Sequence, residues 1–274
     1  MSIVVNTNVS SLNAQRNLGS TSDMLKTSME RLSSGNRINS AKDDAAGLAI
    51  STRMNSQISG MKVAQRNAGD GISMAQTAEG AMGEITSMLG RMRDLALQAK
   101  NGTNSDNDRL NLNEEYTQLA AEIQRTYQST TFNDQKIIGA SATSFVFQVG
   151  ANNGDEITVS LENVASMSGV NSANTGAISA VSGASQGIAA IDIALNSINS
   201  ARSKLGAAQN RFEATIANLG TAEANLSEAR GRIVDTDFAK ETAELSKNQV
   251  LQQAGAAMLA QANQSPQIAL SLLR

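Results

Sequence analysis

Residues 191–236 read IDIALNSINSARSKLGAAQNRFEATIANLGTAEANLSEARGRIVDT, and this stretch decides the fold. A large apolar residue recurs at every seventh position, and Ala or Thr follows each one three positions later. A strict seven-residue period makes a narrow seam along one α-helix, which only a second helix running alongside can bury. The pattern therefore predicts a long helix in an elongated helical rod or coiled coil. The apolar series is Ile191, Ile198, Leu205, Phe212, Leu219, Leu226 and Ile233.

A second series with the same period lies in the N-terminal half, in a helix predicted over about residues 41–100. It is rich in Ala and Met, and small side chains let helices approach closely while Met fills irregular gaps. This seam suits the series of residues 191–233, although a Met-rich binding groove is the alternative. We expect a rod core formed by Ile198, Leu205, Phe212, Leu219, Leu226, Ile233, Met61, Met82 and Leu89.

Shorter patterns predict three further helices, over about residues 5–33, 105–129 and 235–264. In the first of these, Leu18, Leu25 and Leu32 are seven residues apart, and we expect Met29 to fill the intermediate position of the seam. Gly35 closes that helix. Ser40 with Asp43 three residues later predicts the capping box that starts the following helix.

The middle of the chain has a different pattern. Two runs rich in β-branched and aromatic residues, 144–149 and 157–161, flank an Asn/Gly-rich turn and predict a β-hairpin. From Ala165 to about Ala189 the chain is mostly Ser, Ala, Gly and Asn, which predicts a loop or a loosely ordered crossover. The class is therefore mainly α with a small β-hairpin region.

Composition excludes most catalytic chemistry. The 274 residues include no Cys and no His, which removes thiol nucleophiles, Ser-His and Cys-His relays, disulfides and the usual zinc sites. Asp43 and Asp44 form an acidic pair, but carboxylates in the first turn of a helix are ordinary and no third ligand is nearby. We therefore expect no enzyme, no catalytic residue, no metal and no cofactor.

Charge and hydropathy narrow the partners. The net charge is −3 and 17% of residues are charged, which is too weak and balanced for binding nucleic acid through its phosphates. The first residues lack the basic and apolar segments of a cleaved secretory signal, and no stretch approaches the ~20 apolar residues of a membrane span. We expect no nucleic-acid partner and no membrane insertion. Taken alone, these facts describe a cytoplasmic coiled-coil scaffold.

Both ends of the sequence carry apolar residues that need a partner. Exposed apolar segments are an aggregation hazard unless another chain covers them. We therefore expect the two end segments to be buried by assembly with other copies. The residues expected to form this core are Ile3, Val5, Leu12, Leu18, Leu25, Leu259, Leu270, Leu272 and Leu273.

Several blocks resemble the bacterial flagellins, the subunits of the flagellar filament. Residues 31–50, RLSSGNRINSAKDDAAGLAI, follow the most distinctive block of that family almost letter for letter. Further matches are RNAGDGIS at residues 66–73, DTDFA at 235–239 and LSLLR at 270–274. The resemblance covers roughly residues 1–139 and 190–274. Asp134 departs from it, because glycine is usual there, and this affects the loop shape expected after Phe132-Asn133.

The resemblance implies a domain organisation in which N-terminal and C-terminal segments pair as an antiparallel helical rod. Residues 1–42 and 235–274 would be the two halves of an inner-core helical domain. Residues 43–139 and 191–234 would be the two halves of a rod domain. Residues 140–190 would form a short hairpin and loop region in place of the variable outer domains that flagellins often carry.

The function implied is that of a structural subunit that polymerises with itself into the flagellar filament for motility. It would be extracellular, exported through the flagellar secretion channel without a cleaved signal peptide. Implied partners are an export chaperone at about residues 235–274 and the hook-associated and cap proteins. A hook–filament junction protein is the alternative, separable by its low copy number in isolated filaments.

The resemblance also implies a host receptor. Family members with Arg91, Leu95 and Glu115 at the matching positions are recognised by a Toll-like receptor of the innate immune system. All three residues are present here. The alternative is structural: Arg91 and Glu115 would be solvated charges and Leu95 a residue of the rod surface.

Overall fold

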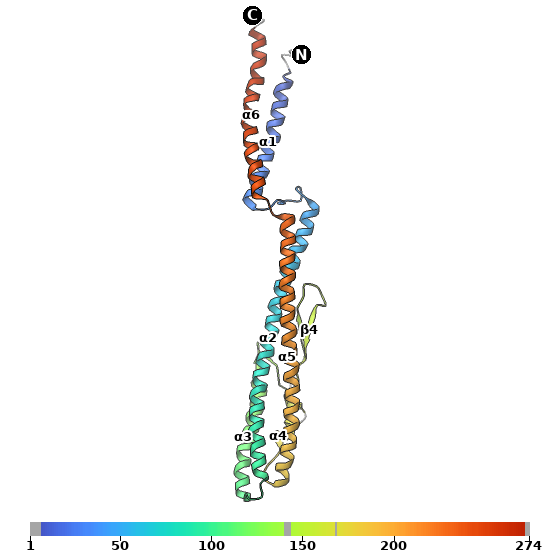
Figure 1. Cartoon of the computed structure of the whole chain (residues 1–274), viewed down its shortest axis with the longest axis vertical. Coiled ribbons are helices and arrows are strands. Elements are labelled where there is room, and N and C mark those ends of the chain that lie inside the picture. The colour runs from blue at the N-terminus through green and yellow to red at the C-terminus, as the bar shows by residue number, and fades with distance from the viewer. Residues whose placement is uncertain (1–6, 140–143, 168, 272–274) are drawn as a thin grey trace. The chain divides into compact units, whose positions relative to one another are not determined.

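The computed structural model describes residues 7–139, 144–167 and 169–271, which divide into two compact units. Unit 1 is built from the chain up to Ser56 and from Asn225 onward, and unit 2 is Gln57–Ala224 (Figure 1). The mainly α class is confirmed. The helices are α1 (Val9–Ser34), α2 (Ala45–Lys100), α3 (Asp106–Ser129), η1 (Val164–Ser166, a 3₁₀ turn), α4 (Val170–Thr175), α5 (Val181–Val234) and α6 (Phe238–Ser271).

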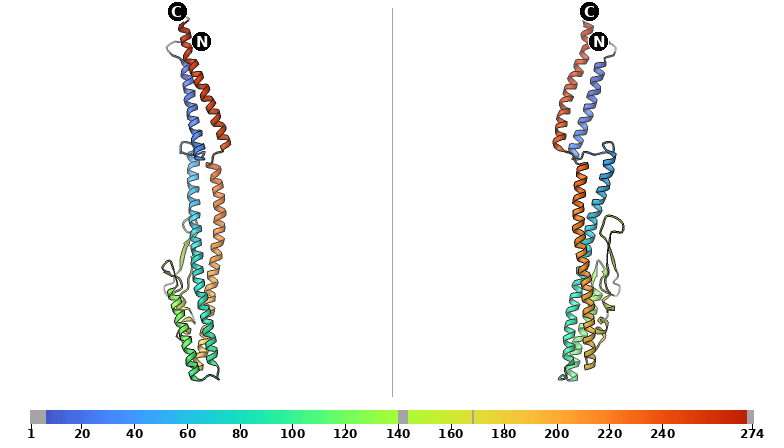
Figure 2. Two further views of the ribbon diagram at one scale, coloured as in Figure 1. Left: turned by 90° about the vertical axis from the view of Figure 1, so that its left-hand side faces the viewer. Right: turned by 45° about the vertical axis from the view of Figure 1, so that its right-hand side comes forward.

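In unit 2, α2 and α5 run antiparallel and side by side, as Figures 1 and 2 both show. Ion pairs across the two helices fix this direction, because residue numbers rise along α2 while those of their partners fall along α5. These pairs are Lys62 with Glu223, Glu79 with Arg202 and Arg93 with Asp192. Helix α3 runs back along α2, and the exposed ion pair between Arg91 and Glu115 joins the two. Helices α2, α3 and α5 therefore lie together at the lower end of unit 2 as drawn in Figure 1.

The core of unit 2 is the meeting of the two heptad seams. Met82 and Leu89 from α2 and Ile198 and Phe212 from α5 have no exposed surface. Burial declines beyond Phe212, since Leu219 in the same series is only partly buried. The seven-residue apolar series of α5 therefore continues beyond the part of the helix in which its side chains are fully buried.

The predicted β-hairpin is present. Strands β3 (Phe145–Gln148) and β4 (Glu156–Val159) pair antiparallel, with Phe145 opposite Val159 and Gln148 opposite Glu156. The hairpin is attached to the helices by Asn67, whose side-chain amide donates to the carbonyl of Gln148 at 2.9 Å. Its alternate residues Ile157 and Val159 are buried, so one face of the hairpin adds to the core.

A second, shorter hairpin follows α3 and is missed by the sequence patterns. Strands β1 (Thr131–Phe132) and β2 (Gln135–Lys136) pair through a two-residue turn. Asn133 and Asp134 in that turn have φ angles of 49° and 62°. Two consecutive positive φ values define a type I′ hairpin turn, in which Asp takes a conformation that glycine adopts at lower cost.

The loop predicted from Ala165 to Ala189 is wrong. This segment contains part of η1, then α4 and the first turns of α5, which begins at Val181. The segment is packed into the core: Val170, Ala173, Ile178 and Ala184 have no exposed surface. Because the side chains are small, the segment lacks the periodic large residues that mark a helix, and contacts with the rest of unit 2 hold its structure.

The start of α2 also differs from the prediction. Asp43 does not cap a helix at Ser40, because α2 begins at Ala45. Its carboxylate instead closes the preceding turn by accepting from the backbone N–H groups of Ser40 and Asn39, at 2.9 and 3.1 Å. These hydrogen bonds, that of Ser40 first, hold the pKa of Asp43 below its usual value. Asp44 caps α2 by accepting from the N–H of Gly47 at 2.8 Å.

In unit 1, α1 and α6 run antiparallel and side by side (Figures 1 and 2). Below them, two extended segments cross as an isolated antiparallel bridge between Asn36 and Asp235. The N–H of Arg37 donates to the carbonyl of Val234 at 2.6 Å, and the N–H of Thr236 donates to the carbonyl of Gly35 at 3.0 Å. Backbone hydrogen bonds therefore hold residues 35–37, which follow α1, against residues 234–236, which precede α6.

Candidate functional site

The interface between α1 and α6 is built from polar residues. The side chains most buried between the two helices are hydroxyls, an amide and a carboxylate, in contrast to the apolar seam of unit 2. Large apolar side chains at this seam are only partly buried, as at Leu18, Leu25 and Leu259. The buried polar residues are Ser11, Thr21 and Ser28 of α1 and Glu241 and Asn248 of α6.

Direct polar contacts set the register of this pair. The side-chain amide of Asn8 donates to the carbonyl of Ala262 at 2.7 Å, and Ser11 Oγ donates to Asn263 Oδ1 at 2.7 Å. A buried hydrogen bond contributes about 0.5–1.5 kcal/mol, so such contacts specify one alignment but add less than an apolar seam of equal length. The α1–α6 pair therefore has a defined register, but the residues between the two helices contribute little to its stability.

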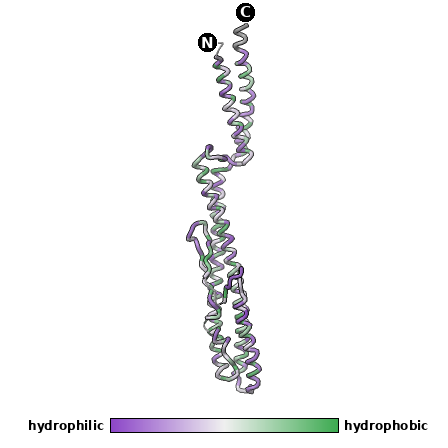
Figure 3. Tube along the Cα trace, turned by 180° about the vertical axis from the view of Figure 1, so that it is seen from behind, coloured by the Kyte–Doolittle hydropathy of each residue, from purple (hydrophilic) through white to green (hydrophobic). Residues whose placement is uncertain are grey.

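The outer face of the α1–α6 pair carries the large apolar side chains that its interior lacks. Figure 3 shows hydrophobic and hydrophilic residues alternating along both helices. Each of these side chains is at least 43% exposed. We call them the outer apolar set: Val9, Leu12, Met24 and Met29 of α1, and Phe238, Val250, Leu251 and Met258 of α6.

Part of the outer apolar set lines a groove between the two helices. The groove has a volume of about 620 Å³ and is walled by Met24 and Leu18 from α1 and by Leu251 and Met258 from α6. Gly255 forms part of its floor, where the side chain of Leu18 lies 3.4 Å from the position that a Cβ would take. An apolar groove on an exposed helix pair fits apolar side chains of another chain.

Met29 corrects the predicted seam of the first helix. The sequence places Met29 at the intermediate position between Leu25 and Leu32, but this side chain is 57% exposed. Ser28 is buried there instead, at 4% exposure. The seam of α1 therefore alternates leucine with small polar residues, and Met29 belongs to the outer apolar set.

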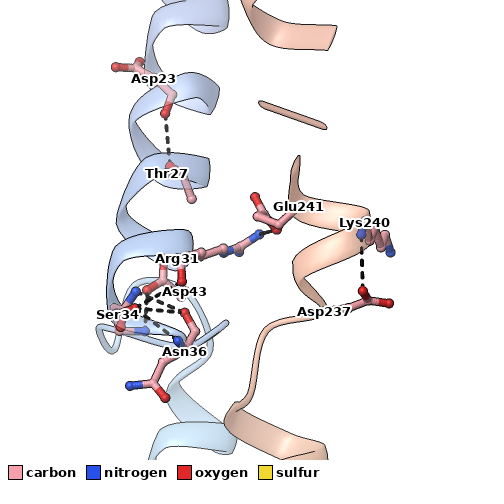
Figure 4. A network of polar contacts seen from close by, with 10 residues as sticks. Asp23, Thr27, Arg31, Ser34, Asn36, Asp43, Asp237, Lys240 and Glu241 are labelled. Atoms are coloured by element: carbon pink, nitrogen blue, oxygen red, sulfur yellow. Dashed lines mark hydrogen bonds and ion pairs between the residues drawn. The ribbon is translucent and has the colours of Figure 1, made fainter. Parts of the chain in front are cut away.

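A polar cavity lies beside the crossing of unit 1. Its volume is about 680 Å³, and Arg31 extends across it from α1 to Glu241 of α6, with a separation of 3.7 Å between Arg31 Nη1 and Glu241 Oε2 (Figure 4). Within the described residues, Arg31 Nε and Thr236 Oγ1 are buried without a hydrogen-bond partner. Mixed charge and open volume make this a solvated junction rather than a reaction centre.

The remaining residues predicted for assembly are placed as follows. Leu12 is exposed and Leu18, Leu25 and Leu259 are partly buried. Ile3, Val5, Leu272 and Leu273 lie outside the described residues, as does the side chain of Leu270 within α6. The residues predicted for the rod core that belong to unit 1, Leu226 and Ile233, are partly buried.

The three residues linked to receptor recognition separate into two environments. Arg91 Nη2 and Glu115 Oε1 form an exposed ion pair between α2 and α3 with a separation of 2.7 Å. Leu95 is 1% exposed and lies in the core of unit 2, so its expected alternative place on the rod surface is wrong. Of these three residues, Arg91 and Glu115 have exposed side chains and Leu95 does not.

The described residues show no arrangement for metal chemistry. In residues 7–139, 144–167 and 169–271, no three acidic side chains lie close enough together to hold a metal ion. Nor does any helix in those ranges have the length and apolar character needed to cross a membrane.

Sequence comparisons match both halves of the chain to one family. Residues 5–143 match the bacterial flagellin N-terminal helical region, and residues 188–273 match the bacterial flagellin C-terminal helical region. The chain is 47% identical over 273 residues to the flagellin of Halalkalibacterium halodurans, covering 99% of this chain and 100% of that protein. It is 57% identical over 164 residues to flagellin A of Vibrio cholerae, covering 60% of this chain but 43% of that protein.

Solved structures agree on the fold. The crystal structure of Bacillus cereus flagellin has a TM-score of 0.52 and 31% sequence identity, covering 56% of this chain and 88% of that one. A putative flagellar hook-associated protein from Vibrio parahaemolyticus has a TM-score of 0.61 over 70% of this chain and 100% of that one. Its sequence identity is 14%, so this second likeness concerns the fold alone.

The matches to both flagellin regions, on a fold of antiparallel helix pairs and small hairpins, define a structural protein of the flagellar filament class. The chain belongs to the bacterial flagellin family.

Proposed function

We propose that this chain is the repeating subunit of a flagellar filament and that it polymerises through the outer apolar set of unit 1. The observation that carries the proposal is the burial pattern of the α1–α6 pair, in which the most buried side chains are polar and eight large apolar side chains are exposed. Water contact with these side chains costs about 25 cal/mol per Å² of apolar surface, and a stack of identical copies removes it.

We also propose the finer features of the role, and membership of the flagellin family supports them. The subunit is exported through the flagellar secretion channel, resides outside the cell in the filament and serves motility. An export chaperone binds within about residues 235–274, where α6 presents Val250, Leu251 and Met258 before assembly covers them. Hook-associated and cap proteins contact the ends of the polymer, and a host Toll-like receptor meets the exposed Arg91–Glu115 pair.

The 47% identity to a flagellin over nearly the whole chain supports assignment as a filament subunit rather than as a hook–filament junction protein. The match to H. halodurans flagellin runs over nearly every residue of both chains, whereas the likeness to a hook-associated protein has 14% identity. Copy number in isolated filaments gives an independent check, because the filament subunit is the dominant protein there.

A pair of matched substitutions tests the assembly surface. Leu251→Gln replaces a 43% exposed leucine on α6 of unit 1, and Leu110→Gln makes the same change at a 55% exposed leucine on α3 of unit 2. Sedimentation and electron microscopy of purified chains should show filaments for wild type and Leu110→Gln but few or none for Leu251→Gln. Equal polymerisation by both variants would contradict the assignment of the surface.

A further inference from the structure

The methionines of this chain are divided sharply by exposure. Of the eleven in the sequence, all but Met1 are described. Five of the six in unit 2 are buried, and the sixth, Met88, is partly buried. In unit 1, Met54 is partly buried and Met24, Met29 and Met258 are 46%, 57% and 65% exposed. All described methionines with at least 46% of their surface exposed therefore belong to the outer apolar set.

These three thioethers also lie where assembly needs apolar surface. Met24 from α1 and Met258 from α6 line the same groove, together with Leu18 and Leu251. Met29 is on the outer side of α1, beyond the groove. In an unassembled subunit these three side chains are exposed to solvent, while Met74, Met82 and Met92 in the core of unit 2 have at most 1% of their surface exposed.

Oxidation would change this surface in a defined way. A thioether sulfur attacks one oxygen of hydrogen peroxide, the O–O bond breaks, and the second oxygen leaves as water after proton transfer. Sulfur loses two electrons and peroxide gains them. The product, methionine sulfoxide, replaces a flexible apolar group with a polar, chiral one that requires a hydrogen-bond partner when buried.

We propose that Met24, Met29 and Met258 form an oxidation-sensitive site that controls polymerisation: peroxide converts them to sulfoxides in the free subunit, and the modified subunit does not enter the polymer. The inference rests on the proposed function, because it assumes that the outer apolar set is buried on assembly. Reduction of the sulfoxides by a methionine sulfoxide reductase restores the thioethers and with them the capacity to assemble.

The first test follows oxidation and assembly together in the full-length soluble chain. Peptide mass spectrometry after hydrogen peroxide treatment should show the three exposed methionines oxidised at least about tenfold faster than Met74, Met82 and Met92. Polymer yield, measured by sedimentation, should fall at least about tenfold while the helical circular dichroism signal is kept. Treatment with methionine sulfoxide reductase should return the yield.

A matched pair of triple variants locates the effect. The variant Met24→Leu, Met29→Leu and Met258→Leu keeps an apolar surface without sulfur, so it should polymerise as well after peroxide treatment as before. The control Met61→Leu, Met88→Leu and Met167→Leu carries the same changes in unit 2 and should still lose polymerisation after peroxide.

The outcomes separate the inference from the proposed function. Untreated wild type that forms no polymer overturns the proposed function, and the inference falls with it. Untreated and peroxide-treated wild type that polymerise equally overturn the inference alone. Loss of polymerisation by the peroxide-treated triple variant of unit 1 also overturns it, because the sensitive groups would then lie elsewhere.

Discussion

The ring of Phe147 in β3 meets the ring of Phe212 in α5 edge to face, with ring centroids 5.4 Å apart and planes at 85°. The same Phe212 ring also lies close to Gly71 of α2, where an added Cβ would be 2.7 Å from Phe212 Cζ. Phe212 thus joins the hairpin, α5 and α2 at one point of unit 2. Edge-to-face rings contribute about 0.5–1.5 kcal/mol beyond the area they bury.

Gly71→Ala should lower the free energy of unfolding by about 1–3 kcal/mol, because the new methyl group forces Phe212 away from its position. The matched control is Gly69→Ala in the same helix, where nothing lies within 4 Å of the added Cβ. That change should raise stability by up to ~1 kcal/mol through helix propensity. Urea denaturation followed by circular dichroism checks both, and a stabilised Gly71→Ala would contradict the packing described.

Tyr116→Phe should destabilise unit 2 by about 0.5–1.5 kcal/mol at neutral pH, because the Tyr116 hydroxyl donates to the carbonyl of Ala173 at 2.8 Å in a buried site. Burial raises the pKa of Tyr116 to about 12 from its usual 10.0. The neutral form is favoured in the folded state, so this stability is complete below pH 10 and is lost as pH rises toward 12.

The measurement for Tyr116 is urea denaturation at several pH values between neutrality and about 12, the raised pKa of Tyr116 in the folded chain. The wild-type chain should lose more stability over this range than Tyr116→Phe. Tyr127 is the second of the two tyrosines, so a Tyr127→Phe background lets ultraviolet absorbance report ionisation of Tyr116 alone. Parallel pH profiles of wild type and Tyr116→Phe would be inconsistent with the raised pKa.

Asp108 should make the start of α3 sensitive to acid. Its carboxylate accepts from the Ser105 hydroxyl and from the Ser105 N–H, at 2.7 and 2.9 Å, completing a capping box. The hydrogen bond from the Ser105 side chain, followed by that from its backbone, holds the pKa of Asp108 below its usual value. A lowered folded pKa means that the stabilisation is present above the usual value and is lost as pH falls through the lowered one.

The check on Asp108 is the helix content and stability of Asp108→Asn over an acid titration. This variant should show a smaller acid-induced loss than wild type, and Ser105→Ala, which removes one donor, should be intermediate. An Asp108→Asn profile identical to that of wild type would show that the capping box contributes nothing to acid sensitivity.

Asp134→Gly should raise stability by about 0.5–1 kcal/mol, because glycine adopts the positive φ of this turn position without the steric cost of a side chain. Asp134→Ala is the control and should lower stability, since alanine lacks the local hydrogen bonding that lets Asp tolerate this region. Thermal unfolding measures both. The reverse order of the two variants would mean that the side chain of Asp134 matters more than its backbone.

The heptad series made the α2–α5 pair predictable from sequence, because a seven-residue period of large side chains is a local pattern that tertiary structure rarely overrides. The β3–β4 hairpin was predictable for the same reason, from two runs around an Asn/Gly turn. The β1–β2 hairpin was not, because its strands have two residues each and its turn is Asn133-Asp134 instead of the usual Asn-Gly.

The outer apolar set could not be derived from periodicity. Leu18, Leu25 and Leu32 indicate a seam for α1, but they do not reveal that Ser28 rather than Met29 is buried between them. That choice depends on how α6 lies against α1, and α6 is more than two hundred residues away along the chain, as the Asn8–Ala262 hydrogen bond shows. The helices were predictable, whereas the side of each helix left to solvent required the structure.

This separation along the chain sets the order in which the molecule can fold. Helix α1 must wait for α6, and α2 must wait for α5, so an N-terminal half emerging first has only the packing of α3 against α2. Pairings between distant segments form late because loop closure must precede the contacts that reward it. A nascent polypeptide therefore cannot complete either long helix pair until its last third is delivered.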